Sequence, residues 1–143
     1  MPEPTAPAAR TDQGLGRVLV LVYAVFAISA TGRSTVQLLQ KADEAPLAYG
    51  LSGFAAAVYV VATVCLARPG PFTTRLAWAA VVLELVGVVV VGALTIAVPD
   101  LFPDDTVWSR FGSGYGYVPA ALPLLGLAWL WRTAPLSGTP ARR

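Results

Sequence analysis

Glu84 is the leading candidate for a functional residue in this chain, because it is the only charged residue in a long apolar run. The run, Leu76 to Val98, has 23 residues, and as a helix it would be about 34 Å long, enough to cross a bilayer core of about 30 Å. A carboxylate at mid-membrane costs about 3 kcal/mol on insertion scales unless it is protonated, paired or hydrated. Two hypotheses follow: Glu84 binds a proton or lies on an ion pathway, or it only hydrogen-bonds neighbouring helices.

The face of the helix that carries Glu84 predicts that this acid points toward protein rather than lipid. Ala77, Ala80 and Gly87 stand three or four residues apart on the same face. Small residues of this kind let a second helix approach closely. We therefore expect another helix beside Glu84.

Arg33 belongs to a polar stripe in the first apolar segment. Ser29, Arg33 and Gln37 are four residues apart and share one helix face. One interpretation is a cationic group at the mouth of a polar cavity that opens outside the cell. The alternative is an arginine that anchors the helix at the membrane surface or pairs with a loop.

A second polar face runs through the next apolar segment. Its hydroxyl-bearing members are spaced for one helix face: Tyr49, Ser52, Tyr59 and Thr63. Tyr59 is nine residues from Arg68, and Glu84 is nine residues from Arg75, so the two match in depth. Because a buried Tyr hydroxyl needs a partner, the sequence predicts a hydrogen bond between Tyr59 and Glu84.

The chain has few residues of the types that usually act in catalysis. The chain has no His, and Cys65 is its only cysteine, which excludes an internal disulfide and a metal site made of His and Cys. Gly14-Leu15-Gly16 stands alone, without a phosphate-binding pattern. We therefore expect no cofactor, no metal site and no catalytic residues, although a Ser or Tyr nucleophile with a Lys, Asp or Glu base stays open.

Composition indicates an integral membrane protein. The 143 residues are 56% hydrophobic and 13% charged, with a net charge of +2, which is too small to argue for a nucleic-acid partner. We predict an all-α fold, a bundle of four transmembrane helices at about 18–39, 45–67, 76–98 and 115–131. The membrane domain would cover 17–132, between a disordered arm (1–16) and a disordered tail (133–143).

Basic residues predict the orientation. Seven fall on one side of the predicted membrane: Arg10, Arg17, Arg68, Arg75, Arg132, Arg142 and Arg143. Lys41 and Arg110 fall on the other. The positive-inside rule then predicts a multi-pass protein of the cell membrane with both termini in the cytoplasm.

The segment between the third and fourth spans, Asp100 to Gly116, should lie outside the cell. It contains Trp108, Arg110 and Tyr115, with Tyr117 just after it, and we expect it to cap the bundle as a loop or a short interfacial helix. Its Gly-Tyr-Gly sequence invites comparison with a potassium-channel filter. However, Ser and Gly stand where that filter has Val and Thr, which favours a glycine-rich turn that places the two tyrosines at the interface.

Three stretches of the chain carry a wider resemblance: EAPLAYGLSG, WAAVVLELVGV and LFPDDTVWSRFGSGYGYVP. With them, the chain resembles small four-span integral membrane proteins of actinobacteria. The resemblance implies the architecture and no activity.

Three functions remain open on the sequence. The first is an oligomeric transporter or channel, with an outward polar vestibule that ends at Glu84. The second is a non-catalytic accessory subunit or lipid-binding membrane protein, and the third is a membrane enzyme. A cavity reaching Glu84 from outside would favour the first, and a dry bundle with an exposed apolar groove the second. Besides the lipid bilayer, we expect copies of this chain or a larger membrane protein as partners.

Overall fold

The computed structural model describes residues 7–68 and 70–133, and within them the fold is all-α. No strand occurs in this part of the chain. The elements in order are α1 (Pro7–Lys41), α2 (Pro46–Ala67), α3 (Pro71–Ala97), the 3-10 helices η1 (Pro99–Leu101) and η2 (Ser109–Tyr115), and α4 (Val118–Thr133). The predicted disorder of 1–6 and 134–143 falls outside the described residues.

Proline marks the start of three helices. Pro7, Pro46 and Pro71 stand at or near the first helical position, where the missing N–H removes no helical hydrogen bond. α1 therefore begins before the predicted first span and includes residues 7–16, which the sequence placed in a disordered arm. Ala, Arg and Gln in this stretch are good helix formers.

Three helices are long and apolar enough to cross a membrane: Gly14–Lys41 within α1, Pro46–Ala67 and Pro71–Ala97. They correspond to the first three predicted spans. α4 has 16 residues, so it is about 24 Å long and falls short of a typical hydrocarbon core of about 30 Å.

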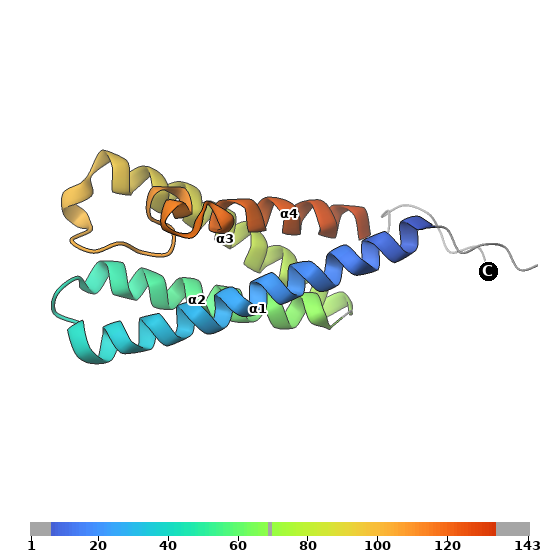
Figure 1. Ribbon diagram of the computed structural model, residues 1–143, viewed down its shortest axis with the longest axis horizontal. Helices are drawn as coiled ribbons and strands as arrows, with labels where there is room; N and C mark the ends of the chain where they lie inside the picture. Colours follow the sequence, from blue (N-terminus) through green and yellow to red (C-terminus); the bar gives the residue numbers. More distant parts are fainter. Residues whose placement is uncertain (1–6, 69, 134–143) are drawn as a thin grey trace, which may run out of the picture.

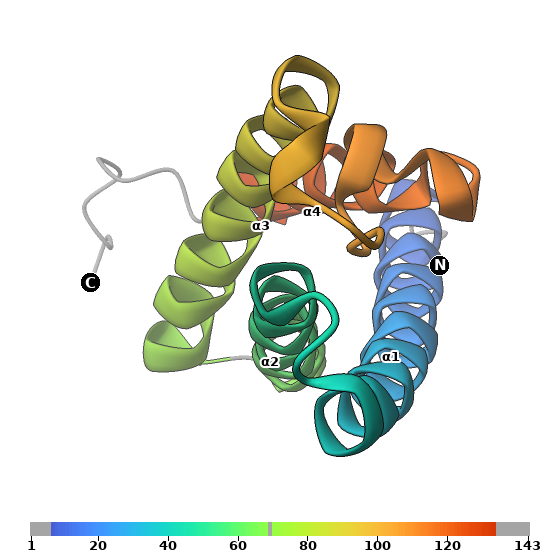
Figure 2. The same ribbon diagram turned by 90° about the vertical axis from the view of Figure 1, so that its left-hand side faces the viewer.

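The helices form a ring in chain order that closes weakly. α1 packs along α2, α2 along α3 and α3 along α4, whereas α4 and α1 share few contacts. Figure 2 looks along the bundle and shows α2 between α1 and α3, with α4 and its preceding loop on the opposite side. An opening between α1 and α4 follows from this arrangement.

The two ends of the bundle differ in charge. The start of α1, the α2–α3 connection and the end of α4 lie at one end, on the right in Figure 1. We call it the basic end, after Arg17, Arg68, Arg75 and Arg132. The α1–α2 turn and residues 98–117 lie at the opposite end, which we call the loop end.

The buried face of α1 lies beside the predicted polar stripe and does not coincide with it. It is formed by residues three or four apart: Leu19, Tyr23, Ala27, Ala30 and Ser34. Ser29 and Arg33 each lie one position before this face and are exposed, while Gln37 is half-buried. Because of this shift, Tyr23 rather than Ser29 lies in the interior of the bundle.

Candidate functional site

Glu84 is completely buried, with an exposed fraction of 0%. Its Oε2 accepts a hydrogen bond of 2.7 Å from the Tyr23 hydroxyl. Its Oε1 has no hydrogen-bond partner among the described residues. The hydrogen bond that we predicted from Tyr59 is therefore made by Tyr23, a residue for which the sequence predicted no role.

Tyr23 reaches Glu84 because α4 provides space beside it. Gly126 lies so close that a Cβ there would be 3.2 Å from the Tyr23 hydroxyl oxygen and 3.2 Å from Val81. Tyr23 stands four residues before Ala27 and seven before Ala30, so it shares a helix face with these two small residues, which favour close helix packing. This pattern could have identified Tyr23 as an interior residue, but it is hard to distinguish because the residues around it are apolar as well.

Tyr59 binds the α3–α4 segment instead of Glu84. Its hydroxyl accepts a hydrogen bond of 3.1 Å from Nε1 of Trp108. Its ring lies 6.3 Å from that of Tyr23, between centroids. Tyr59 therefore lies beside the Tyr23–Glu84 pair and connects it to the loop end.

Trp108 is inside the bundle, with 1% of its surface exposed. A Cβ on Gly87 would be 2.6 Å from its ring, so α3 needs a glycine at this contact. Gly87 is three residues beyond Glu84, or about 4.5 Å nearer the loop end. Trp108 thus packs on α3 about one turn beyond Glu84, a deeper insertion than the cap expected from the sequence.

A short left-handed turn follows Trp108. Arg110, Phe111 and Gly112 have φ of 50°, 61° and 81°, a region that costs non-glycine residues about 1 kcal/mol or more each. The Arg110 N–H donates to Thr95 Oγ1 at 2.8 Å, and Phe111 packs against Gly92 of α3. These contacts with α3 hold the turn in place.

A polar hollow of about 360 Å³ opens beside this turn, and its walls include Arg33, Asp105, Ser109, Arg110, Ser113 and Tyr115. The Arg33 guanidinium donates a hydrogen bond to the Tyr115 hydroxyl. Its carbon also lies 5.9 Å from the centre of the Tyr115 ring, within reach of a cation–π contact. The loop therefore surrounds Arg33 on its exposed side.

The other predicted site residues differ in burial and in contacts. Ser52 is buried, and Thr63 donates to the Tyr59 carbonyl at 2.6 Å. Gln37 has a buried Oε1 without a partner in the described residues. Tyr117 is exposed, with a φ of 62°.

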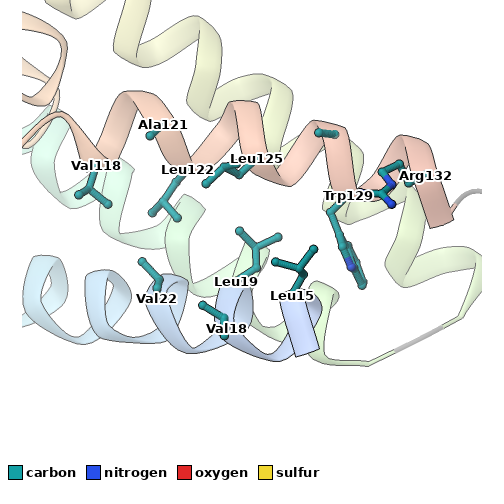
Figure 3. Close-up of a pocket in the computed structure, with 11 residues that line it drawn as sticks. Leu15, Val18, Leu19, Val22, Val118, Ala121, Leu122, Leu125, Trp129 and Arg132 are labelled. Carbon is teal, nitrogen blue, oxygen red and sulfur yellow. The ribbon is translucent and has the colours of Figure 1, made fainter. Parts of the chain in front are cut away.

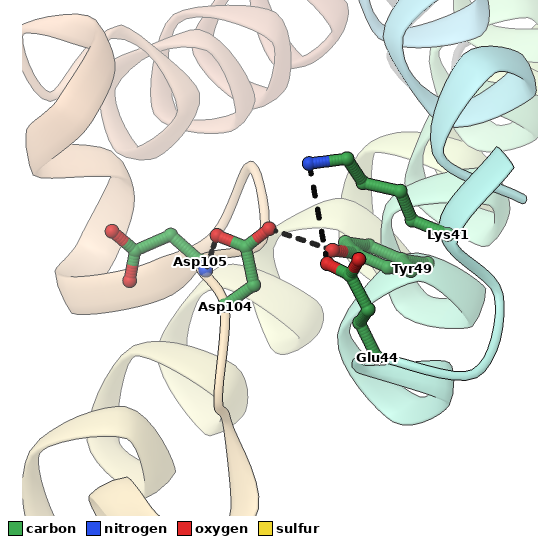
Figure 4. Close-up of polar contacts among 5 residues, drawn as sticks. All are labelled: Lys41, Glu44, Tyr49, Asp104 and Asp105. Atoms are coloured by element: carbon green, nitrogen blue, oxygen red, sulfur yellow. Dashed lines mark hydrogen bonds and ion pairs between the residues drawn. The ribbon is translucent and has the colours of Figure 1, made fainter.

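Tyr49 connects α2 to the segment before Trp108. Its hydroxyl donates to Asp104 Oδ2 at 2.9 Å, and Asp104 Oδ1 accepts from the Asp105 N–H at 2.8 Å. Figure 4 shows these contacts beside the ion pair of Lys41 and Glu44, whose charged atoms are 4.0 Å apart. The acid of this group that faces the polar hollow is Asp105.

An apolar groove of about 430 Å³ lies between α1 and α4 (Figure 3). Its walls include Leu15, Leu19 and Val22 of α1 and Ala121, Leu122, Leu125 and Trp129 of α4. Arg132 lines it at the basic end. We call it the α1–α4 groove; it occurs where the ring of helices closes weakly.

The geometry offers three distinct environments: a buried carboxyl, a polar hollow and an apolar groove. Glu84 lines neither the hollow nor the groove. Among the described residues, no group of three His, Cys, Asp or Glu side chains could hold a metal ion. Comparisons with protein-family models, with curated proteins and with solved structures gave no match.

Proposed function

We propose that this protein is a non-catalytic membrane protein that holds a lipid acyl chain in the α1–α4 groove. The observation that carries the proposal is the groove itself, an apolar hollow of about 430 Å³, within the size range of ligand pockets. Its position between two helices gives a chain access from the bilayer.

The dimensions favour an acyl chain over a transmembrane helix. The groove extends from Val118 to Arg132 along α4, about 21 Å of helix, whereas one leaflet of the hydrocarbon core is about 15 Å thick. An α-helix with its side chains is a stiff cylinder about 10 Å across, whereas a flexible acyl chain can follow a narrow groove between two helices. The groove therefore suits a single acyl chain better than a further helix.

Charge at the groove supports a lipid as well. Arg132 lies at the basic end, so a lipid whose chain occupied the groove from that end would bring its phosphate close to a guanidinium. Cationic side chains at the membrane interface attract phosphate groups. The proposed ligand is therefore a phospholipid of the leaflet at the basic end.

We place that leaflet on the cytoplasmic side of the cell membrane, with four spans and both termini inside. Support comes from the basic residues gathered at one end of the bundle, as the positive-inside rule requires. α4 would be a short fourth span, which thinning of the bilayer accommodates at modest cost. The α3–α4 segment would then be outside.

Transport is the second candidate, and one observation favours it. Oε1 of Glu84 is buried without a hydrogen-bond partner in the described residues, as a group that takes up a proton or a water would be. However, the buried Trp108 packs on α3 at Gly87, between the level of Glu84 and the loop end. Proteoliposomes would decide: a proton flux that Glu84→Gln abolishes supports transport, and a rate equal to that of empty liposomes contradicts it.

The lipid proposal is tested by filling the groove. Ala121→Trp places a large side chain in the groove, and Ala57→Trp places the same side chain on an exposed position of α2 outside it. Native mass spectrometry of the purified proteins should show a phospholipid on the parent chain and on Ala57→Trp, and several-fold less on Ala121→Trp. Equal retention by all three would contradict the proposal, and a retained second protein chain would identify a different occupant.

A further inference from the structure

We propose that the polar hollow at the loop end is a binding site for a phosphate group, held by Arg33 and Arg110. The site is separate from the α1–α4 groove, and the two are lined by different residues. The phosphate could belong to a lipid headgroup or to a free ion, and the experiment below distinguishes these sources.

Arg33 is positioned for an anion by a contact that leaves its charge unneutralised. The Tyr115 hydroxyl and ring hold the guanidinium in place, but neither group is negatively charged. Among residues 7–68 and 70–133, Arg33 has no ion-pair partner. An ordered guanidinium loses less freedom on binding a ligand than a mobile one.

Arg110 is the second arginine that lines the same hollow. Its backbone is fixed by the hydrogen bond to Thr95 and by the left-handed turn. It too lacks an ion-pair partner in the described part of the chain. Two guanidinium groups around one hollow suit a ligand with several acceptor oxygens, since each can bind oxygens in a forked arrangement.

Hydroxyl groups complete the walls. Ser109 and Ser113 line the hollow together with the Tyr115 hydroxyl, and hydroxyls are donors to phosphate oxygens. The opposing charge is Asp105, which lines the hollow as well. Two cations against one acid leave a net positive site, and a volume of about 360 Å³ is ample for a phosphate group.

The test is a titration of the full-length protein in a neutral detergent with inorganic phosphate, at constant ionic strength against chloride. We expect saturable binding to the parent by calorimetry, with a higher unfolding temperature in phosphate than in chloride. Arg33→Gln and Arg110→Gly should each weaken binding at least about tenfold, since each removes a charged, forked donor. Asp105→Asn should strengthen it.

Three controls separate lost binding from lost folding and test where the phosphate binds. Arg110→Gly removes the charge and also relieves a residue at φ 50°, so its unfolding temperature without phosphate should be no lower than that of the parent. Arg75→Gln removes an arginine of the basic end and should bind phosphate like the parent. Ala121→Trp should do so as well, which keeps this test independent of the α1–α4 groove.

A second titration identifies the source of the phosphate. Because the α1–α4 groove is itself proposed to bind a phospholipid, this titration uses the Ala121→Trp background for every protein. Short-chain phosphatidic acid in the same detergent should bind tighter than inorganic phosphate if the ligand is a headgroup, and no tighter if it is a free ion. In either case the two arginine variants should weaken binding of the preferred ligand. The proposal is overturned if the parent binds neither, or if Arg33→Gln and Arg110→Gly bind both as the parent does.

Discussion

Glu84 contributes to the bundle through one hydrogen bond, made in surroundings where an unsatisfied polar atom is costly. The Tyr23 hydroxyl and Glu84 Oε2 come from helices that are distant in sequence, α1 and α3. The bond satisfies the Tyr23 hydroxyl as a donor and Glu84 Oε2 as an acceptor, and an unpartnered buried donor or acceptor costs about 1–3 kcal/mol. The pair therefore favours one relative placement of the two helices.

This pairing predicts a specific pattern of stability. Glu84→Leu leaves the Tyr23 hydroxyl without its acceptor, and Tyr23→Phe leaves Glu84 without its donor, so each should destabilise the protein by about 1 kcal/mol or more. Glu84→Gln keeps an acceptor and should cost less. The double variant Glu84→Leu with Tyr23→Phe should be more stable than the sum of the single effects predicts.

The measurement is thermal unfolding of the purified variants in one detergent. Tyr115→Phe is a suitable control, because it removes a hydroxyl that bonds Arg33 at the loop end rather than Glu84. Additive single effects in the double variant would mean that the hydrogen bond does not couple α1 to α3.

At the scale of elements, the α3–α4 segment is part of the core rather than a cover on it. Trp108 inserts against Gly87, and Phe111 packs against Gly92. These two glycines are five residues apart on α3, so they admit successive parts of the same segment. Bulky side chains at either position would occupy the space that the loop fills.

Gly87 should therefore be less replaceable than a glycine on an open surface. Gly87→Ala puts a Cβ 2.6 Å from the Trp108 ring, and such overpacking costs about 1–3 kcal/mol. Gly50→Ala meets nothing within 4 Å in α2 and should be neutral or stabilising by up to about 1 kcal/mol. Thermal unfolding, with tryptophan emission to report on Trp108, would compare them, and equal effects would show that the loop is not packed against Gly87.

The helices were more predictable than the loop because their signal is local. Long apolar runs bounded by Pro and polar residues placed α2 to within one residue of its predicted span and the end of α3 likewise, whereas α3 begins at Pro71, five residues before its predicted start. The insertion of Trp108 depends on glycines of α3 and on Tyr59 of α2, which are far from it in sequence. Hydrophobicity alone cannot show whether an aromatic residue enters the bundle or lies at the membrane interface.

The same limit explains which residues of the site the sequence predicted and which it did not. Burial of Glu84 followed from its apolar run and small-residue neighbours. The choice between Tyr23 and Tyr59 as its partner required the rotation of α1, which spacing defines only to within one residue. That small rotation also turned Arg33 and Ser29 away from the interior, and left Arg33 for the loop to surround.

For the whole molecule, the weak contact between α4 and α1 leaves the ring of helices open at one place. α1, α2 and α3 are long enough to cross the membrane, whereas α4 is short and packs mainly on α3. In the proposed function, the α1–α4 groove is the place where the bundle opens to the bilayer. The orientation of the bundle would then determine which leaflet supplies the proposed lipid and which side of the membrane the polar hollow faces.

Orientation and the number of spans can be tested together. In a Cys65→Ser background, Gly114→Cys places a thiol on an exposed loop-end position, and Gly14→Cys places one on an exposed position of α1 toward the basic end. If the basic end is cytoplasmic, a membrane-impermeant maleimide should label Gly114→Cys on intact cells, and Gly14→Cys only after the membrane is opened. A reporter fused after Arg143 then decides the role of α4. The reporter should be cytoplasmic if α4 crosses the membrane. A reporter found outside, with Gly114→Cys still labelled, would mean that the protein has three spans. α4 would then not form a membrane-crossing wall of the groove.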